Sequence, residues 1–291
     1  MKARFALAIC VLFAASLLAG CDRTDEPEAV GGEKSGEEPT PTTVAVVAKD
    51  FSFDAPASIA GGLVEFSFTN QGNEPHFAGF ARVAPGKSFG DVEAAMTAPP
   101  PAEGPAGPPP FEDFAGIPTA DPGTGGRITL NVPAGTYAFF CLIPSPDGVS
   151  HAAKGMVKEL RVGEAIAGRL PEPDITMVAT DFEFDQTPSA EDGSNTVLLR
   201  NEGRQLHEVN LVELGSDGSV DDVIAWYGQP AGPPPMRSLA GVAIRPGEEA
   251  TATMDLKAGS TYAFVCVIPD VLGDFAPHIT KGMFTQTIRV T

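Results

Sequence analysis

Hydrophobic and polar residues alternate along several short segments of the chain. The alternation is clearest at Leu63–Thr69 and Ile128–Val132, where every second residue is a bulky apolar one. A period of two is that of a β-strand with one buried face. Thr136–Phe140 and Thr261–Val265 are instead nearly continuous aromatic and β-branched runs, which predicts strands buried on both faces.

Turn-forming residues separate these segments, as at Asn70-Gln71-Gly72, Pro85-Gly86, Pro133-Ala134-Gly135 and Pro246-Gly247. A helical pattern is found at Asp91–Met96 and Val220–Tyr227, and both segments are short. Many short strands joined by such turns are typical of an all-β fold, here a Greek-key β-sandwich.

The chain contains an internal repeat, which sets its domain organisation. His76 matches His207 within a longer stretch of similarity. The matching segments are 48–54 with 179–185, 70–72 with 201–203, 105–110 with 230–235, 136–141 with 261–266, and 154–156 with 281–283. We therefore expect two tandem domains, at 43–163 and 174–291, with a linker at 164–173. The repeated Pro-Ala-Gly-Pro-Pro-Pro run favours an extended loop, either a docking lip or a passive connection.

The N-terminal segment is typical of an exported protein. Lys2 and Arg4 precede the apolar run Phe5–Leu18, which is too short for a comfortable membrane span, so residues 1–20 are predicted to be a cleaved signal peptide. Leu18-Ala19-Gly20-Cys21 resembles the lipobox of bacterial lipoproteins, which implies lipidation of Cys21 and attachment to the periplasmic or other extracytoplasmic face of a bacterial membrane. Ordinary secretion is the alternative. Residues 21–42 contain almost no bulky apolar side chain and are predicted to be a flexible acidic tether.

The net charge is strongly negative. There are 19 Lys and Arg against 38 Asp and Glu, a net charge of −19, and removal of residues 1–20 brings it to about −21. Such a surface disfavours nucleic acid and favours a cationic partner, although solubility alone would also explain it.

Each half contains the same four residues that could act as metal ligands. A His near a strand start is followed, much later, by a Cys directly after an apolar strand, a second His, and a Met five residues beyond that. These residues are His76, Cys141, His151 and Met156 in the first half, and His207, Cys266, His278 and Met283 in the second. A thiolate, two imidazoles and a weak thioether suit copper in both oxidation states, which favours rapid one-electron transfer.

This arrangement resembles the cupredoxin family, which includes plastocyanin, azurin and the blue-copper domain of nitrite reductase. The resemblance covers both halves, and the loops between Cys and the second His are closer in length to those of nitrite reductase. It implies one mononuclear type 1 copper in each domain, two per chain, held by the eight residues named above. The second half departs further, with a longer loop and with Glu208 directly after His207.

Several alternatives compete with copper ligation. A lone His or Met is more often an ordinary surface or core residue, and Cys141 and Cys266 could form a disulfide in an oxidising compartment. However, the chain has four His residues in total, and all of them occupy the expected ligand positions.

The expected function is electron transfer with a redox partner, such as a basic c-type cytochrome or a membrane oxidoreductase. Copper capture or delivery is an alternative, as is a metal-free binding module. We expect no enzymatic activity, because catalytic copper centres need further histidines and this chain has none to spare.

Overall fold

The structure, a computed structural model, describes residues 40–98, 108–164, 167–186, 188–229 and 232–290. The predicted signal peptide, Cys21, residues 21–39 of the predicted tether and parts of both proline runs lie outside the described residues. No helix within the described ranges is long and apolar enough to cross a membrane.

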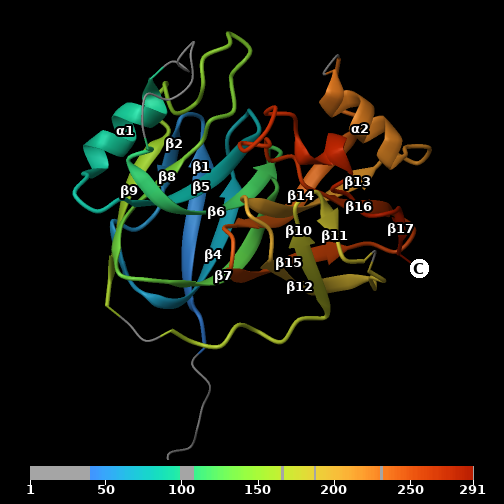
Figure 1. The fold of residues 1–291 in the computed structure, drawn as a ribbon, viewed down its shortest axis with the longest axis horizontal. Helices are drawn as coiled ribbons and strands as arrows, with labels where there is room; N and C mark the ends of the chain where they lie inside the picture. The colour runs from blue at the N-terminus through green and yellow to red at the C-terminus, as the bar shows by residue number, and fades with distance from the viewer. Residues whose placement is uncertain (1–39, 99–107, 165–166, 187, 230–231, 291) are drawn as a thin grey trace, which may run out of the picture. The chain divides into compact units, whose positions relative to one another are not determined.

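Strands dominate both halves of the chain (Figure 1). The first half consists of β1 (Thr42–Lys49), β2 (Ser52–Asp54), β3 (Ser58–Ala60), β4 (Gly62–Asn70), β5 (His76–Val83), α1 (Phe89–Thr97), β6 (Phe111–Ala120), β7 (Gly125–Val132), β8 (Gly135–Phe140) and β9 (Val157–Gly163). The second half consists of β10 (Ile175–Thr180), β11 (Glu183–Phe184), β12 (Gly193–Asn201), β13 (His207–Leu214), α2 (Val220–Gly228), β14 (Met236–Ile244), β15 (Glu249–Leu256), β16 (Thr261–Val265), the 3₁₀ helix η1 (His278–Lys281) and β17 (Ile288–Arg289). The fold is all-β, with two tandem β-sandwich halves, as predicted.

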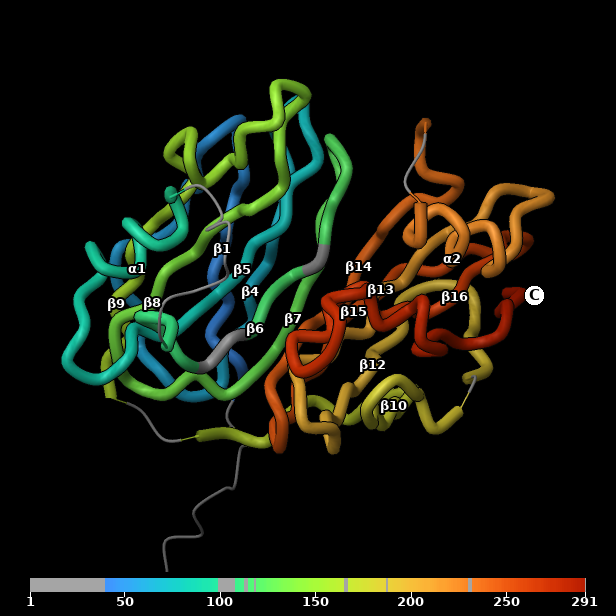
Figure 2. The backbone as a smooth tube through the Cα atoms, turned by 45° about the horizontal axis from the view of Figure 1, so that its top comes forward, coloured from blue at the N-terminus to red at the C-terminus, as the bar shows by residue number. Residues whose placement is uncertain are grey.

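Both β-sheets continue from one half into the other. One has the strand order β11-β10-β12-β15-β7-β4-β1-β2, and the other has the order β17-β16-β13-β14-β6-β5-β8-β9-β3. The halves meet where β15 pairs with β7 and β14 pairs with β6, both antiparallel. In Figure 2 the blue-to-green half therefore lies directly against the yellow-to-red half. The sequence did not indicate this joining, and the boundaries at 163 and 174 stay a prediction.

Alternating burial explains why the predicted strands form. The Leu63–Thr69 and Ile128–Val132 segments lie in β4 and β7, which pair with each other. Phe66 and Phe68 on β4 are 1% and 2% exposed, so one face of this strand enters the core between the sheets. The Phe66 ring packs against Phe80 and Phe139, with ring centroids 5.0 and 5.6 Å apart. Such aromatic packing supplies much of the apolar burial that holds the sandwich together.

The two helices confirm the short helical segments predicted from the sequence. Ser88 caps α1 and Ser219 caps α2, and in each case the residue three positions on (Asp91 or Asp222) completes a capping box. This exchange satisfies backbone amides that the first turn leaves unpaired. Each helix packs on the outer face of the nine-stranded sheet, where Val92 and Val223 are fully buried.

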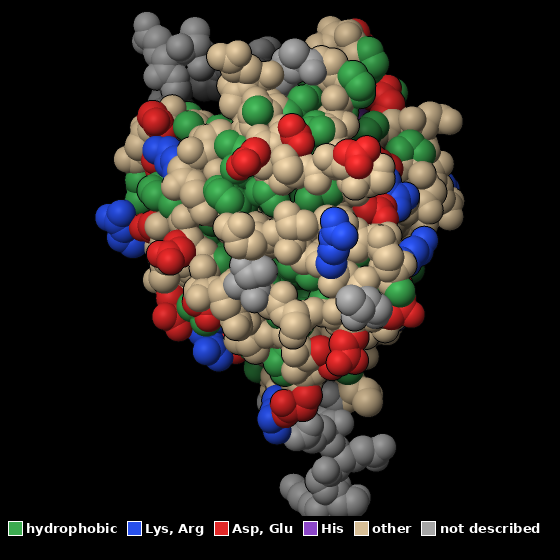
Figure 3. All heavy atoms as spheres, turned by 90° about the vertical axis from the view of Figure 1, so that its right-hand side faces the viewer, with side chains coloured by type: hydrophobic (Ala, Val, Ile, Leu, Met, Phe, Trp, Pro, Cys, Tyr) green, Lys and Arg blue, Asp and Glu red, His purple; other side chains and the backbone are tan. Residues whose placement is uncertain are grey.

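The face of the second half turned to the viewer in Figure 3 has a mixed surface. Acidic and basic side chains lie scattered among hydrophobic ones on this face. Charge of a single sign does not gather there among the described residues, so this face adds nothing to the expectation of a cationic partner.

Candidate metal centre

His76 is the first residue of β5, and its ring is oriented by a residue that is not itself a predicted ligand. Asp50, in the turn after β1, lies 3.2 Å from His76 Nε2. The Asp50 carboxylate also accepts hydrogen bonds from the backbone and side chain of Asn73. Burial acts to raise the pKa of Asp50, but these hydrogen bonds and that from His76 outweigh it and lower the pKa to about 2. The carboxylate is therefore charged at neutral pH and fixes the ring orientation of His76.

Cys141 follows β8, and the loop after it returns to the same place. The Cys141 amide donates to the carbonyl of Met156 (3.2 Å), and the Ala152 amide donates to the carbonyl of Cys141 (2.7 Å). Within the loop, the amide of His151 donates to the carbonyl of Ile143 (2.9 Å). These bonds close the loop and direct His151 toward the cysteine.

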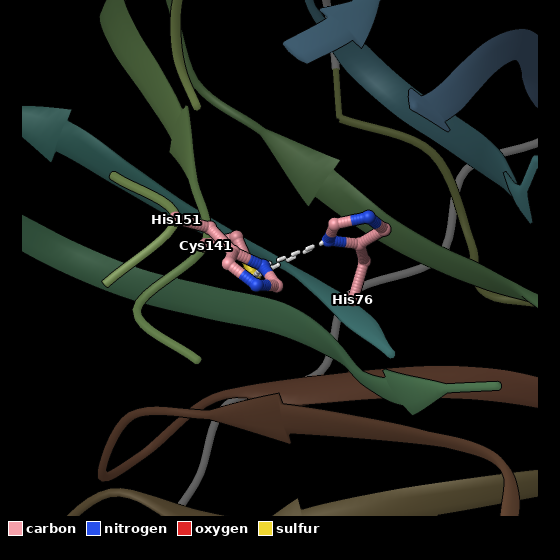
Figure 4. A group of neighbouring side chains, drawn as sticks. All are labelled: His76, Cys141 and His151. Carbon is pink, nitrogen blue, oxygen red and sulfur yellow. Dashed lines mark hydrogen bonds between the residues drawn. The ribbon is translucent and has the colours of Figure 1, made fainter. Parts of the chain in front are cut away.

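The first three predicted ligands come together in one buried group (Figure 4). The Nδ1 atoms of His76 and His151 are 2.9 Å apart. The Cys141 Sγ lies 3.5 Å from Nδ1 of His151 and 3.9 Å from Nδ1 of His76. All three side chains are fully buried, so two imidazole nitrogens and one sulfur face a common point from three separate chain positions.

The second half builds the same group. His207 starts β13, and its Nε2 lies 3.2 Å from Asp181, which corresponds to Asp50. Cys266 follows β16, and its Sγ lies 3.4 Å from Nδ1 of His278. His207, Cys266 and His278 offer ligand atoms that all lie within 4.8 Å of one another.

His76, His207 and His278 are suited to act as neutral ligands. Burial lowers the pKa of His76 and His207, and it lowers the pKa of His278 to about 4. At neutral pH these rings are uncharged, with a lone pair on one nitrogen. Where Nε2–H donates to Asp50 or Asp181, that lone pair is on the Nδ1 that faces the sulfur.

Both thiols are protonated in the absence of a metal. Burial raises the pKa of Cys141 to about 11 and raises that of Cys266 well above its ordinary value. Hydrogen bonds from backbone amides act in the opposite direction and lower the pKa of each thiol. The amides of Phe77 and Ile143 do so at Cys141, and those of Glu208 and Ile268 do so at Cys266. A metal that binds as the thiolate complex must therefore displace a proton.

The methionines lie next to the cysteines through their backbones. Met156 and Met283 are fully buried, and their carbonyls accept hydrogen bonds from the amides of Cys141 and Cys266. Each methionine amide in turn donates to the carbonyl of the histidine five residues before it. Their role as axial ligands stays a prediction.

The donor set in each half fits copper. Two imidazole nitrogens and one cysteine sulfur in a buried setting are the ligands of blue-copper sites, with a thioether as the weak fourth. In the second half, the buried Nδ1 of His207 has no hydrogen-bond partner among the described residues. A buried polar atom without a partner is costly, and ligation of a metal would satisfy it. Cys141 and Cys266 are free cysteines in separate groups, so the disulfide alternative does not hold.

The two groups differ in what contacts the second histidine. In the first half Glu74 accepts from His151 Nε2 at 2.8 Å, and this hydrogen bond is the main reason that the pKa of Glu74 is lowered. The corresponding residue in the second half is Gln205, which donates to Asp270 instead. The Nε2 of His278 is buried and has no partner among the described residues.

A second difference lies beside the first histidine of each group. Phe77 follows His76, whereas Glu208 follows His207 and is almost fully buried. The Glu208 carboxylate accepts a hydrogen bond from the Val267 amide at 2.9 Å. Burial nevertheless raises the pKa of Glu208 to about 7.

The sequence analysis did not assign a role to Asp50, Asp181, Gly72 or Gly203, although all four are in the repeated segments. A Cβ added at Gly72 would lie 2.7 Å from Nε2 of His76, and one added at Gly203 would lie 2.5 Å from Nε2 of His207. Glycine is needed at both positions because the loop backbone passes directly against the histidine ring. Recurrence at the same offset as the histidines was the feature that could have identified them.

When the chain is compared with known proteins, it matches solved structures. No family model and no curated protein matches the chain. An auracyanin from Roseiflexus castenholzii is 23% identical and covers 43% of this chain and 100% of its own, with a TM-score of 0.30. A copper nitrite reductase from Nitrosomonas europaea is 17% identical and covers 87% and 94%, with a TM-score of 0.25. A multicopper oxidase is 15% identical and covers 86% and 88%, with a TM-score of 0.24.

The prediction that the chain is not an enzyme was wrong. The solved structures that align with both halves include ones named as a copper nitrite reductase and a multicopper oxidase, which are enzymes. The prediction rested on the number of histidines in one chain. That number does not limit a site whose ligands are shared between two chains, so it is no ground for excluding catalysis.

The fold and the two ligand groups agree with each other. Each half is a β-sandwich in which the first strand position of β5 or β13 supplies one histidine. The loop after β8 or β16 supplies the cysteine and the second histidine, and the three ligand atoms meet in the interior. Each half thus combines a cupredoxin-like β-sandwich with a buried His/Cys/His group that could hold a metal ion.

Proposed function

We propose that this protein transfers electrons, with one type 1 copper in each half. The observation that carries the proposal is that one ring nitrogen from each of two histidines and a cysteine Sγ lie within 4.8 Å of one another in both halves. Copper bound by such donors supplies one-electron oxidation and reduction with little change in ligand arrangement.

The residues around each group support fast electron exchange by holding the ligands in place. Asp50 and Asp181 fix one histidine of each group through hydrogen bonds to Nε2. The paired backbone bonds between Cys141 and Met156, and between Cys266 and Met283, hold the closing loop. Because these ligands are positioned by the fold itself, we expect little rearrangement when the oxidation state changes.

We further propose that the protein acts on the extracytoplasmic side of a membrane. Residues 1–20 serve as a signal peptide, and Cys21 is the lipidated N-terminus after cleavage. The net charge of −19 favours a basic redox partner, such as a c-type cytochrome, with attraction that weakens as the screening length falls to about 8–10 Å near physiological salt.

The test is copper loading followed by electron exchange. The protein should bind close to two coppers per chain and develop an intense thiolate-to-copper absorption band, as the cupredoxin resemblance implies. Stopped-flow mixing with a reduced basic cytochrome should bleach that band, faster at low salt than at high salt. Loaded protein that lacks the band, or whose band is not bleached by any one-electron reductant, would contradict the proposal.

A further inference from the structure

A pocket of about 640 Å³ lies between the two halves, next to both cysteine-bearing loops. Leu142 and Ile143, which follow Cys141, line one side of it. Val267 and Ile268, which follow Cys266, line another. An occupant of this pocket would therefore contact both loops that close the copper-binding groups.

Most of the lining is apolar, but the second half contributes a group of polar side chains. Glu208 and Asn210 on β13 and Tyr227 on α2 all line the pocket. Asn210 is 2% exposed, and its Oδ1 has no hydrogen-bond partner among the described residues. Glu208 is 5% exposed and its carboxylate contacts the Val267 amide. The polar atoms on this wall include hydrogen-bond acceptors, and the acceptor of Asn210 is not used by the fold.

The first half fills the corresponding positions with apolar side chains, and one of them, Phe77, itself lines the pocket from the other side. The repeat aligns Phe77, Gly79, Met96 and Phe140 with Glu208, Asn210, Tyr227 and Val265, respectively. In the first half the rings of Phe77 and Phe140 pack together with centroids 6.1 Å apart. A Cβ added at Gly79 would lie 2.6 Å from the Phe140 ring, so no space is left there. Hydrocarbon is thus sufficient for the fold at these positions, and the polar side chains of the second half need another explanation.

We propose that this pocket binds a small, mainly apolar molecule that carries a hydroxyl group, which donates its hydrogen bond to Oδ1 of Asn210. The size of the pocket suits a molecule with one or two rings. The hydroxyl would satisfy the buried acceptor, and the remainder would be buried against Ile143, Val267 and Ile268. This site goes beyond the proposed electron transfer, because binding there does not require copper.

The experiment uses a matched pair of fluorinated probes with the metal-free protein. ¹⁹F NMR titrations should show saturable binding of 4-fluorobenzyl alcohol and binding of 4-fluorotoluene that is at least about tenfold weaker. A site built to pair with a hydroxyl discriminates strongly against an analogue that lacks it. Asn210→Leu should abolish this preference, and Asn210→Asp, which keeps an acceptor oxygen, should retain it.

A second pair of variants tests the location without altering the buried wall. Val271 lines the pocket and is 57% exposed, whereas its neighbour Leu272 is 65% exposed and does not line it. Val271→Trp should weaken binding of the alcohol several-fold by narrowing the entrance, and Leu272→Trp should leave it unchanged. These exposed substitutions keep the test valid even if Asn210→Leu fails to fold.

Three results would overturn the proposal. The first is the absence of saturable binding, which would mean that the pocket holds only water. The second is equal affinity for the two probes. The third is that Val271→Trp and Leu272→Trp have equal effects on binding. Loss of binding in Val271→Trp alone, together with a preference for the alcohol, would support it.

Discussion

The two metal-binding groups have the same ligand types but different surroundings. In the first half, His151 donates to the carboxylate of Glu74 at 2.8 Å. In the second half the corresponding residue is the neutral Gln205, which donates to Asp270, so the buried Nε2 of His278 is left without a partner among the described residues. The loop between cysteine and histidine is two residues longer in the second half, and it brings in Asp270.

This difference shows that a duplicated ligand set need not give two equivalent sites. A carboxylate on a ligand histidine orients the ring and favours the more highly charged oxidation state of a bound metal. We therefore expect the first site to bind Cu(II) more tightly and to have the lower reduction potential. Glu208 lies beside the second site, and burial raises its pKa to about 7, so the comparison is cleanest at pH 6, where Glu208 is mostly neutral.

The largest expected effect is the loss of one site at a time. Cys141→Ser and Cys266→Ser should each bind one copper fewer per chain, because serine cannot replace the soft thiolate donor. The thiolate-to-copper band should fall correspondingly, by copper analysis and absorption on the same sample. Full colour in either variant would show that its cysteine is not a ligand, and the double variant should be colourless.

The next effect concerns the glycines that pass against the ligand histidines. Gly72→Ala and Gly203→Ala place a methyl group where His76 or His207 and its aspartate now lie, so each should weaken copper binding at its own site. A loss of about 10- to 100-fold is typical when a partner of a metal ligand is disturbed. Gly90→Ala on α1 is the control, since its added Cβ makes only ordinary contact. If both variants bind copper as tightly as the unmodified protein does, the rings of His76 and His207 can shift to make room for the added methyl groups.

A smaller effect should follow from making the first site like the second. Glu74→Gln removes the carboxylate from His151 and should raise the reduction potential of the first site, because Cu(II) loses a favourable charge. A tenfold change in the affinity ratio of the two oxidation states corresponds to about 59 mV, which is the expected order of the shift. Glu93→Gln on the exposed face of α1 should leave both potentials unchanged. A shift confined to the second site would refute this assignment.

The smallest effect should be the same in both halves. Ser88→Ala and Ser219→Ala each remove a capping box of the same geometry, so each should lower the free energy of unfolding by about 1 kcal/mol. Denaturant unfolding of the metal-free protein measures this, with the exposed Ser216→Ala as the control. Unequal losses would show that the halves differ in stability as well as in their metal sites.

The sequence predicted the parts of the molecule that recur, and it showed that the second half has a longer loop and Glu208, but not what these differences contact. The strands, both helices and the convergence of His76, Cys141 and His151 could be predicted, because hydrophobic alternation and the repeat each point to them. The joining of the sheets at Gly116 and Ala243 could not, because pairing between distant strands leaves no local pattern. The exchange of Glu74 for Gln205 is visible in the sequence, but its meaning depends on the contact with His151.

The most direct test of the account is a spectroelectrochemical titration of the copper-loaded protein at pH 6. We predict that the thiolate-to-copper band bleaches in two separate one-electron steps. The step at lower potential should disappear in Cys141→Ser, and the step at higher potential should disappear in Cys266→Ser. Two sites with the same potential, or the reverse assignment of the two steps, would contradict the claim that Glu74 sets the sites apart. Absence of the band would contradict the copper sites themselves.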